Sequence, residues 1–203
     1  ISFGYDISQY LHWGEENVIA VRVDNAEQPN SRWYSGCGIY RNVWMVKTGQ
    51  TRVAPSGVYV IPKVTYLPDP ETGGMGSLHE GFFFVQTDVI ANEATELRVR
   101  HMAMDASGRK AGMVEEVLGV NEIGETEMMV RIEKPHLWSV DDPYLYTLVT
   151  ELETLDGELL DRVETRTGLR HFFFSPEEGF FLNNEPVDIN GVCMHHDLGC
   201  LGA

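Results

Sequence analysis

The chain has 203 residues, a formal net charge of −16 and a hydrophobic fraction of 43%. That hydrophobic fraction supports a packed core and excludes disorder, and the acidic surface repels phosphate backbones and excludes nucleic acid as a partner. No long uncharged apolar run occurs, so we expect no membrane span, and the start at ISFGYDIS without Met fits a fragment of a longer protein.

The first half of the chain alternates apolar and polar residues with a period of two, as strands do. In NVIAVRV, Ile19, Val21 and Val23 share one face. The aromatic run Phe82–Phe84 predicts another strand. In ELRVRHM, at 96–102, apolar residues oppose two arginines. These segments predict strands with one apolar face.

The same period continues in the second half. Strands are predicted around Met129–Ile132 and at the aromatic run Phe172–Phe174. The segment YLYTLVTEL, at 144–152, is apolar on both faces, so we expect it to lie between two packed layers. The best helix candidate, Ala111–Leu118, is short and contains Gly112, so convincing helices are missing.

Turn signals separate the predicted strands. Hairpins should close at 105–108 (DASG) and at Asp156-Gly157, because glycine adopts positive φ at low cost. Asn183-Asn184 can form another tight turn, since asparagine tolerates the left-handed region. A long turn-rich loop spans Leu67–Ser77. The spacing predicts mostly antiparallel β structure arranged as a sandwich.

Two boundaries are visible along the chain. The sequence turns polar at Lys47–Ser56, and a segment of sandwich length then runs to about Thr167–Arg170. After Arg170 we expect a hairpin and a short apolar strand at Val187–Val192. The boundaries predict three parts, at 1–48, 49–169 and 170–203.

Three stretches together resemble glycoside hydrolase family 2. RWYSGCGIYRNVW at 32–44 is similar to the last strands of that family's jelly-roll sugar-binding domain. PHLWSVDDPYLYTL at 135–148, followed by GLR at 168–170, resembles the end of its immunoglobulin-like domain. GFFLNNEPVDINGVCMHHD at 179–197 resembles the entry into its catalytic (β/α)₈ barrel. The resemblance therefore implies an all-β chain: an immunoglobulin-like β-sandwich flanked by a jelly-roll tail and the first strand of a truncated barrel.

The resemblance implies a retaining glycosidase whose two glutamates lie on later barrel strands, so we expect no catalytic residue in this chain. Family members carry the acid/base glutamate in an Asn-Glu dipeptide. Three such pairs occur here, at 92–93, 121–122 and 184–185. Each lies beside turn-forming or charged residues, so we interpret them as turn residues.

The C-terminal CMHHDLGC follows the predicted barrel strand, and active sites lie at the carboxyl ends of barrel strands. By the resemblance, His195 and Asp197 are the substrate-binding candidates; relatives often have an acidic residue where His196 stands. Cys193, His195, His196, Asp197 and Cys200 offer metal-ligand types, but their spacing matches no zinc pattern, so we expect no metal and no cofactor. The three cysteines are too few for a disulfide framework.

One loop and the set of tryptophans each have two interpretations. The loop DNAEQPNSR at 24–32 reaches the sugar pocket in relatives, but Ser31 stands where some β-galactosidases have Asp, so a surface loop is the stronger interpretation. The four tryptophans, Trp13, Trp33, Trp44 and Trp138, could form a saccharide platform. Most such aromatics are core or interface residues.

Three functions are open at this point. The leading hypothesis is a non-catalytic connecting portion of an exo-acting β-glycosidase, a β-galactosidase before a β-glucuronidase or β-mannosidase. Its partners would be the catalytic barrel of the same polypeptide and a carbohydrate substrate of the full-length enzyme, and its location periplasmic or extracellular. The alternatives are an independent carbohydrate-binding module and an adhesion or scaffold sandwich.

Overall fold

The computed structural model describes residues 3–24, 26, 38–39 and 42–192, and the chain divides into two compact units. The first unit comprises Ile1–Met45 and Val192–Ala203, and the second comprises Val46–Gly191. In the described residues of the first unit, the one regular element is the 3₁₀ helix η1, Ser8–Tyr10. No described helix is therefore long enough to cross a membrane.

The strand predicted at NVIAVRV does not form in the described residues. Ile19 and Val21 lie in an extended segment without a strand partner, and their side chains are 71% and 57% exposed. A strand needs a hydrogen-bonded neighbour, because a lone extended segment leaves its backbone groups to water. Period-two alternation thus identified the extended conformation but not the partner.

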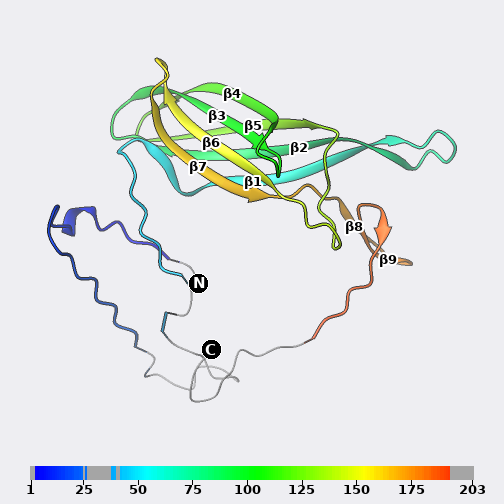
Figure 1. Ribbon diagram of the computed structural model, residues 1–203, viewed down its shortest axis with the longest axis horizontal. Coiled ribbons are helices and arrows are strands. Elements are labelled where there is room, and N and C mark those ends of the chain that lie inside the picture. Colours follow the sequence, from blue (N-terminus) through cyan, green and yellow to red (C-terminus); the bar gives the residue numbers. More distant parts are fainter. Residues whose placement is uncertain (1–2, 25, 27–37, 40–41, 193–203) are drawn as a thin grey trace. The chain divides into compact units, whose positions relative to one another are not determined.

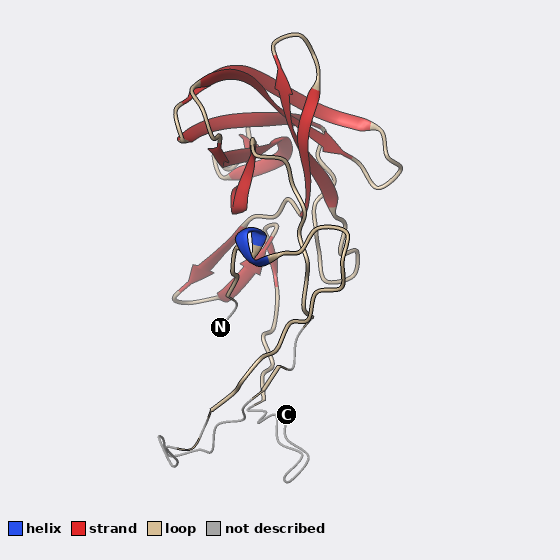
Figure 2. Ribbon diagram, turned by 90° about the vertical axis from the view of Figure 1, so that its left-hand side faces the viewer, coloured by secondary structure: helices blue, strands red, loops and turns tan. Residues whose placement is uncertain are grey.

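The second unit is built from antiparallel sheets (Figures 1 and 2). Sheet A has the order β1-β2-β5, and sheet B has the order β4-β3-β6-β7. A small third sheet, the hairpin sheet, has the order β10-β9-β8. The strands are β1 Arg52–Pro68, β2 Met75–Ile90, β3 Thr95–Met104, β4 Lys110–Val120, β5 Ile123–Glu133, β6 Tyr146–Thr154, β7 Leu159–Thr167, β8 Phe172–Ser175, β9 Gly179–Leu182 and β10 Glu185–Pro186.

The three predicted tight turns are confirmed, whereas the loop predicted at Leu67–Ser77 is shorter, because β1 runs to Pro68 and β2 begins at Met75. Gly108 (φ 79°) closes the β3–β4 hairpin, where Asp105 Oδ1 accepts the backbone N–H groups of Ser107 and Arg109. Gly157 (φ 92°) closes the β6–β7 hairpin. Asn183 and Asn184 have φ values of 52° and 70°, which suits the tight turn between β9 and β10.

Two other expectations are corrected. The weak helix candidate Ala111–Leu118 lies in β4, because its alternating residues pair with β3 in register from Thr95↔Val120 to Ala103↔Gly112. The strand predicted at Val187–Val192 is absent: β10 ends at Pro186, Val187 N–H makes one further hydrogen bond to the Phe180 carbonyl at 2.9 Å, and residues 187–192 have no regular secondary structure. Ile189 and Val192 are 67% and 87% exposed.

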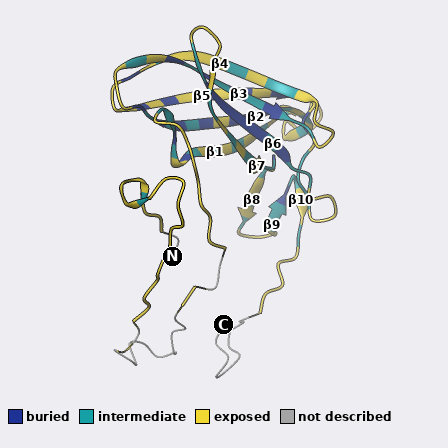
Figure 3. Cartoon of the chain, turned by 60° about the vertical axis from the view of Figure 1, so that its left-hand side comes forward, coloured by how far each residue is buried: buried dark blue, intermediate teal, exposed yellow. Residues whose placement is uncertain are grey.

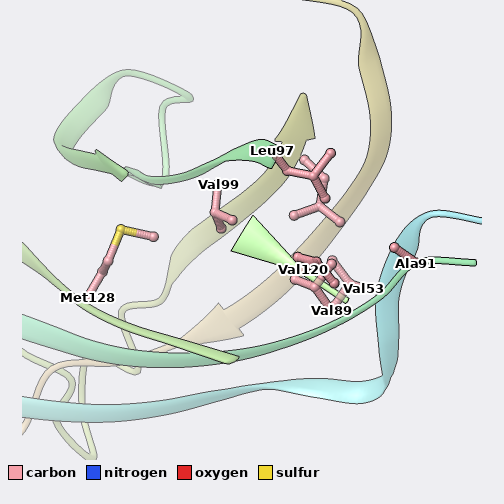
Figure 4. Packing of buried hydrophobic residues seen from close by; sticks show 8 residues of the cluster. Val53, Val89, Ala91, Leu97, Val99, Val120 and Met128 are labelled. Carbon is pink, nitrogen blue, oxygen red and sulfur yellow. The ribbon is translucent and has the colours of Figure 1, made fainter. Parts of the chain in front are cut away.

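Sheets A and B bury one face each against the other (Figure 3). One core cluster gathers around Val89, Val99 and Leu152, as Figure 4 shows in part. A second gathers around Phe83 and Leu148. Both clusters contain residues of both sheets, so the apolar faces predicted from the period-two pattern meet in one two-layered core.

A row of polar side chains crosses the core between the two clusters. His101 is fully buried in β3. Its Nε2 lies 3.3 Å from Thr87 Oγ1 on sheet A, and its Nδ1 lies 3.0 Å from Thr150 Oγ1 on β6. The hydrogen bonds satisfy both ring nitrogens and join the two layers. Burial lowers the pKa of His101 from 6.5 to about 4, so the ring is neutral at pH 7.

The outer face of sheet B carries alternating charges directly across its strands. Glu115 lies opposite Arg100, Arg100 opposite Glu151, and Glu151 opposite Arg162. Arg100 Nε is 2.8 Å from Glu115 Oε2, and Arg162 Nη1 is 3.1 Å from Glu151 Oε1. The strand β6 was expected to lie between two packed layers, and this expectation is corrected: one face of β6 packs in the core, and the charge ladder covers the other face.

Close packing at one end of the core involves a glycine. Gly81 of β2 faces Leu169 and Pro135, and a Cβ at Gly81 would lie 2.6 Å from Leu169 Cδ1 and 2.9 Å from Pro135 Cβ. Leu169 is fully buried, so its side chain has no open space into which it can move. This contact joins β2 to the segments that precede β6 and follow β7.

We therefore expect Gly81→Ala to destabilise the second unit by about 1–3 kcal/mol through overpacking. Gly119→Ala is the matched control, because Gly119 is exposed in β4 and a Cβ there meets nothing within 4 Å. Urea unfolding gives the free energy of unfolding of both variants. Equal stability of the two variants would contradict the packing argument.

The buried histidine predicts a pH dependence of stability. The pKa of His101 is lower in the folded chain, about 4, than its ordinary 6.5, so between these pH values the unfolded state binds more protons. The free energy of unfolding should therefore fall by about 3 kcal/mol as the pH falls through this window. Urea unfolding at pH 7 and pH 4 for the natural chain and for His101→Gln isolates the contribution of this ring. Parallel pH profiles for the two chains would refute it.

Candidate functional site

A connector between β5 and β6, residues 134–145, is tied to the chain that follows β7. Leu137 and Leu169 form a parallel bridge, and Trp138 N–H donates to the Leu169 carbonyl at 2.7 Å. His136 N–H donates to Tyr146 Oη at 2.8 Å, so β6 also holds the connector. The bridge places Trp138 beside Gly168 and Arg170, at the end of the two-layered core.

Asn183 attaches the hairpin sheet to the same place. Its Nδ2 donates to the Trp138 carbonyl at 2.9 Å, and its Oδ1 accepts the His171 N–H at 3.0 Å. Its backbone N–H donates to the His171 carbonyl at 2.7 Å. One asparagine thus fixes the β9–β10 turn to the connector and to the entry of β8, and we call this meeting point the junction.

The junction also contains buried polar atoms that lack hydrogen-bond partners among the described residues. They are Tyr66 Oη, His171 Nδ1 and Asn184 Oδ1. The rings of Tyr66 and His171 meet edge to face with centroids 5.7 Å apart. Burying a polar atom without a partner costs free energy, so these three atoms make the junction less stable by itself than the apolar core.

A hollow of about 270 Å³ opens at the junction. Trp138, Leu145 and Gly168 line it together with the guanidinium-bearing residues Arg166 and Arg170. The Arg170 guanidinium carbon lies 5.5 Å from the centroid of the Trp138 ring, within cation–π range. The hollow therefore combines an aromatic wall with two positive charges, a surface suited to anionic groups.

The carboxyl groups with shifted pKa values are held by hydrogen bonds or ion pairs. Each carboxyl group whose pKa departs clearly from its ordinary value has a lowered pKa: Asp69, Glu80, Asp105 and Glu115. Hydrogen bonds from Arg131 and Arg100 are the main cause for Glu80 and Glu115. A general acid for glycoside hydrolysis needs a raised pKa, so these groups act as structural anions.

The three Asn-Glu pairs lie at turns, as predicted. Glu122 (φ 65°) lies between β4 and β5, and its carbonyl accepts the Ala91 N–H at 2.9 Å. The pair at 92–93 lies between β2 and β3, and in the pair at 184–185 the asparagine lies in the β9–β10 turn and the glutamate begins β10. Local backbone conformation accounts for all three.

The predicted substrate-binding residues His195 and Asp197 lie outside the described residues. The same holds for the other members of the alternative metal set, Cys193, His196 and Cys200, and for Ser31. Within the described ranges no group of three or more His, Cys, Asp or Glu side chains could hold a metal ion.

Trp13 and Trp44 are 70% and 79% exposed in the first unit. Trp138 is half-buried at the junction of the second unit, and Trp33 lies outside the described residues. Arg166 and Arg170, which border the hollow, were not singled out from sequence. Their clearest signal was their position four residues apart, around the GLR motif in a strongly acidic chain.

Comparison with known proteins agrees with this architecture. The family model "Glycosyl hydrolases family 2" matches residues 80–170. The β-galactosidase BoGH2A of Bacteroides ovatus is 45% identical over all of this chain, and a putative β-glucuronidase of Formosa agariphila is 33% identical over all of it. A glycosyl hydrolase family 2 member from Bacteroides cellulosilyticus superposes over 97% of the chain with a TM-score of 0.78 and 29% identity.

The chain spans 23% of the length of the Bacteroides ovatus relative and 18% of the Formosa agariphila relative. It likewise covers 26% of the solved Bacteroides cellulosilyticus chain. The resemblance inferred from sequence is confirmed. These matches identify the chain as a glycoside hydrolase family 2 portion that corresponds to a small part of larger family 2 enzymes.

Proposed function

We propose that this chain is a non-catalytic connecting portion of an exo-acting β-galactosidase. In this proposal residues 1–48 are the last strands of a jelly-roll sugar-binding domain. Residues 49–169 are an immunoglobulin-like sandwich, and residues 170–203 are the hairpin and first strand of a catalytic barrel. The observation that carries the proposal is a two-layered core with a hairpin sheet tied to one end through Asn183.

The packing of the second unit supports a mechanical role. Its largest fully buried side chains fill the space between the sheets, and the charge ladder neutralises its outer face. The junction holds the hairpin sheet by side-chain and backbone hydrogen bonds. A rigid body of this kind can keep two neighbouring domains at a fixed separation.

The first unit also supports the proposal. Its extended, exposed apolar segment around Ile19 and Val21 has the period-two pattern of a strand that needs a sheet. Earlier jelly-roll strands of a longer polypeptide would supply the missing neighbours. Ile189 and Val192 would be covered in the same way by a catalytic barrel.

The substrate class rests on the relatives. The relative that is 45% identical is named a β-galactosidase, while the one that is 33% identical is named a putative β-glucuronidase. The higher identity favours terminal β-galactosides. His195 and Asp197 would line the sugar pocket at the end of the first barrel strand, where barrel active sites lie.

Turnover measurements test the proposal. The 203-residue chain should not hydrolyse 4-nitrophenyl β-galactoside. The polypeptide that extends it to the length of its relatives should hydrolyse this substrate at least about tenfold more efficiently than the β-glucuronide, because a pocket built for one sugar leaves polar groups unpaired with another. Hydrolysis by the 203-residue chain alone, or a preference for the glucuronide, would overturn the proposal. Saccharide affinity of the isolated chain by calorimetry would favour a binding module instead.

The pocket residues can be tested in the longer polypeptide. Asp197→Asn should lower kcat/KM for the β-galactoside by about tenfold or more, since a charge-assisted hydrogen bond to a sugar hydroxyl is lost. His195→Ala should also lower kcat/KM for the β-galactoside. Glu177→Gln is the control, because Glu177 is an exposed acid in the β8–β9 turn. Unchanged kinetics in Asp197→Asn would remove that residue from the site.

A further inference from the structure

Two arginines of the second unit differ from the other described arginines. Arg22, Arg98, Arg100, Arg109, Arg131 and Arg162 each contact a carboxylate. Arg52 donates to the Gln50 carbonyl. Within the described residues, only the guanidinium groups of Arg166 and Arg170 have neither a carboxylate nor a backbone acceptor. Both are exposed and line the same hollow. In a chain of net charge −16 they place two cations without a carboxylate partner in the described part beside one another.

The geometry of the hollow favours a carboxylate. Arg170 stacks on Trp138, which restrains its guanidinium and leaves its N–H groups without an acceptor in the described part. A planar guanidinium matches a carboxylate by two parallel hydrogen bonds, and an ammonium group does not. Arg166 adds a second positive charge on the wall of the same hollow. The site can therefore neutralise one carboxylate that enters beside the indole ring.

The strand that follows Arg170 carries two exposed phenylalanines. Phe172 and Phe174, two and four residues after Arg170, are 54% and 69% exposed. Their neighbour Phe173 instead stacks on Phe181 of β9, with ring centroids 4.7 Å apart. Exposed aromatic side chains next to arginine are typical of protein interfaces. The surface around the hollow therefore fits a protein segment better than a small acid.

We infer that Arg166, Arg170 and Trp138 form a docking site for an Asp or Glu side chain, carried by an apolar segment of the longer polypeptide outside this chain. The inference rests on the proposed function, because the relatives have about three quarters of their length or more outside the matched part. A second copy of this acidic chain is a poorer occupant, since two copies of charge −16 repel each other. The docked carboxylate would fix the following domain against the junction.

Hydrogen exchange in two lengths of chain tests the site. In the longer polypeptide, backbone amides of residues 168–174 should exchange about tenfold or more slowly than in the 203-residue chain, because docking suppresses local opening. Arg170→Ala should remove most of this slowing, and Arg170→Lys should restore only part of it. Arg162→Ala is the matched control, because Arg162 lies in β7, the strand that carries Arg166, and already pairs with Glu151 and Glu164.

The outcomes separate the alternatives. Equal exchange in the two lengths, or equal effects of Arg170→Ala and Arg162→Ala, would overturn the docking site. Binding of free galacturonate or glucuronate to the 203-residue chain, abolished by Arg170→Ala, would overturn it in favour of a soluble acid. Light scattering could also show that the 203-residue chain is a dimer and that Arg170→Ala dissociates it. That result would overturn the proposed occupant in favour of a second copy of this chain. Hydrolysis of 4-nitrophenyl β-galactoside by the longer polypeptide is followed in parallel, so a lack of turnover with intact amide protection refutes the proposed function alone.

Discussion

The second unit is held together by two sheets that each bury one apolar face against the other. Most of that interface is apolar, but its middle is crossed by His101 between Thr87 and Thr150. Hydrogen bonds have directional requirements that packed methyl groups lack, so this row fixes how the sheets lie over each other. The row joins β2, β3 and β6 at one level of the sandwich. The rest of the unit, including the junction, is positioned by that alignment.

The surfaces of the second unit differ in the side chains that are available to bind a neighbouring domain. Sheet B presents alternating charges that already neutralise one another, so its outer face has little to gain from a further partner. The junction presents the opposite case, with unpaired cations, exposed phenylalanines and buried polar atoms without partners in the described part. Under the proposed function, the junction is therefore the end of the sandwich that would bind a neighbouring domain.

Sequence patterns predicted the strands and turns of the second unit well, because there the period-two signal coincides with real sheet partners. Gly108, Gly157 and Asn183 were identifiable since positive φ restricts which residues can form such turns. The segments around Ile19 and Ile189 carry the same signal without partners in the described part, and alternation alone cannot reveal this. At the junction, the turn at Asn183 was predicted, but the meeting of its arginines with Trp138 was not. Its cations come from β7 and the link to β8, and its aromatic wall comes from the β5–β6 connector, so only the folded chain brings them together.

The charge ladder on sheet B has a consequence for how this part of the family can diverge. Arg100 lies opposite both Glu115 and Glu151, and Glu151 also lies opposite Arg162. Reversing one member alone would place like charges face to face across neighbouring strands, which is destabilising. Tolerated substitutions at these four positions are therefore coupled, and sign changes would have to spread along the whole row. Among relatives, the order of charges across these strands should be inherited as a unit, even where the surrounding surface varies freely.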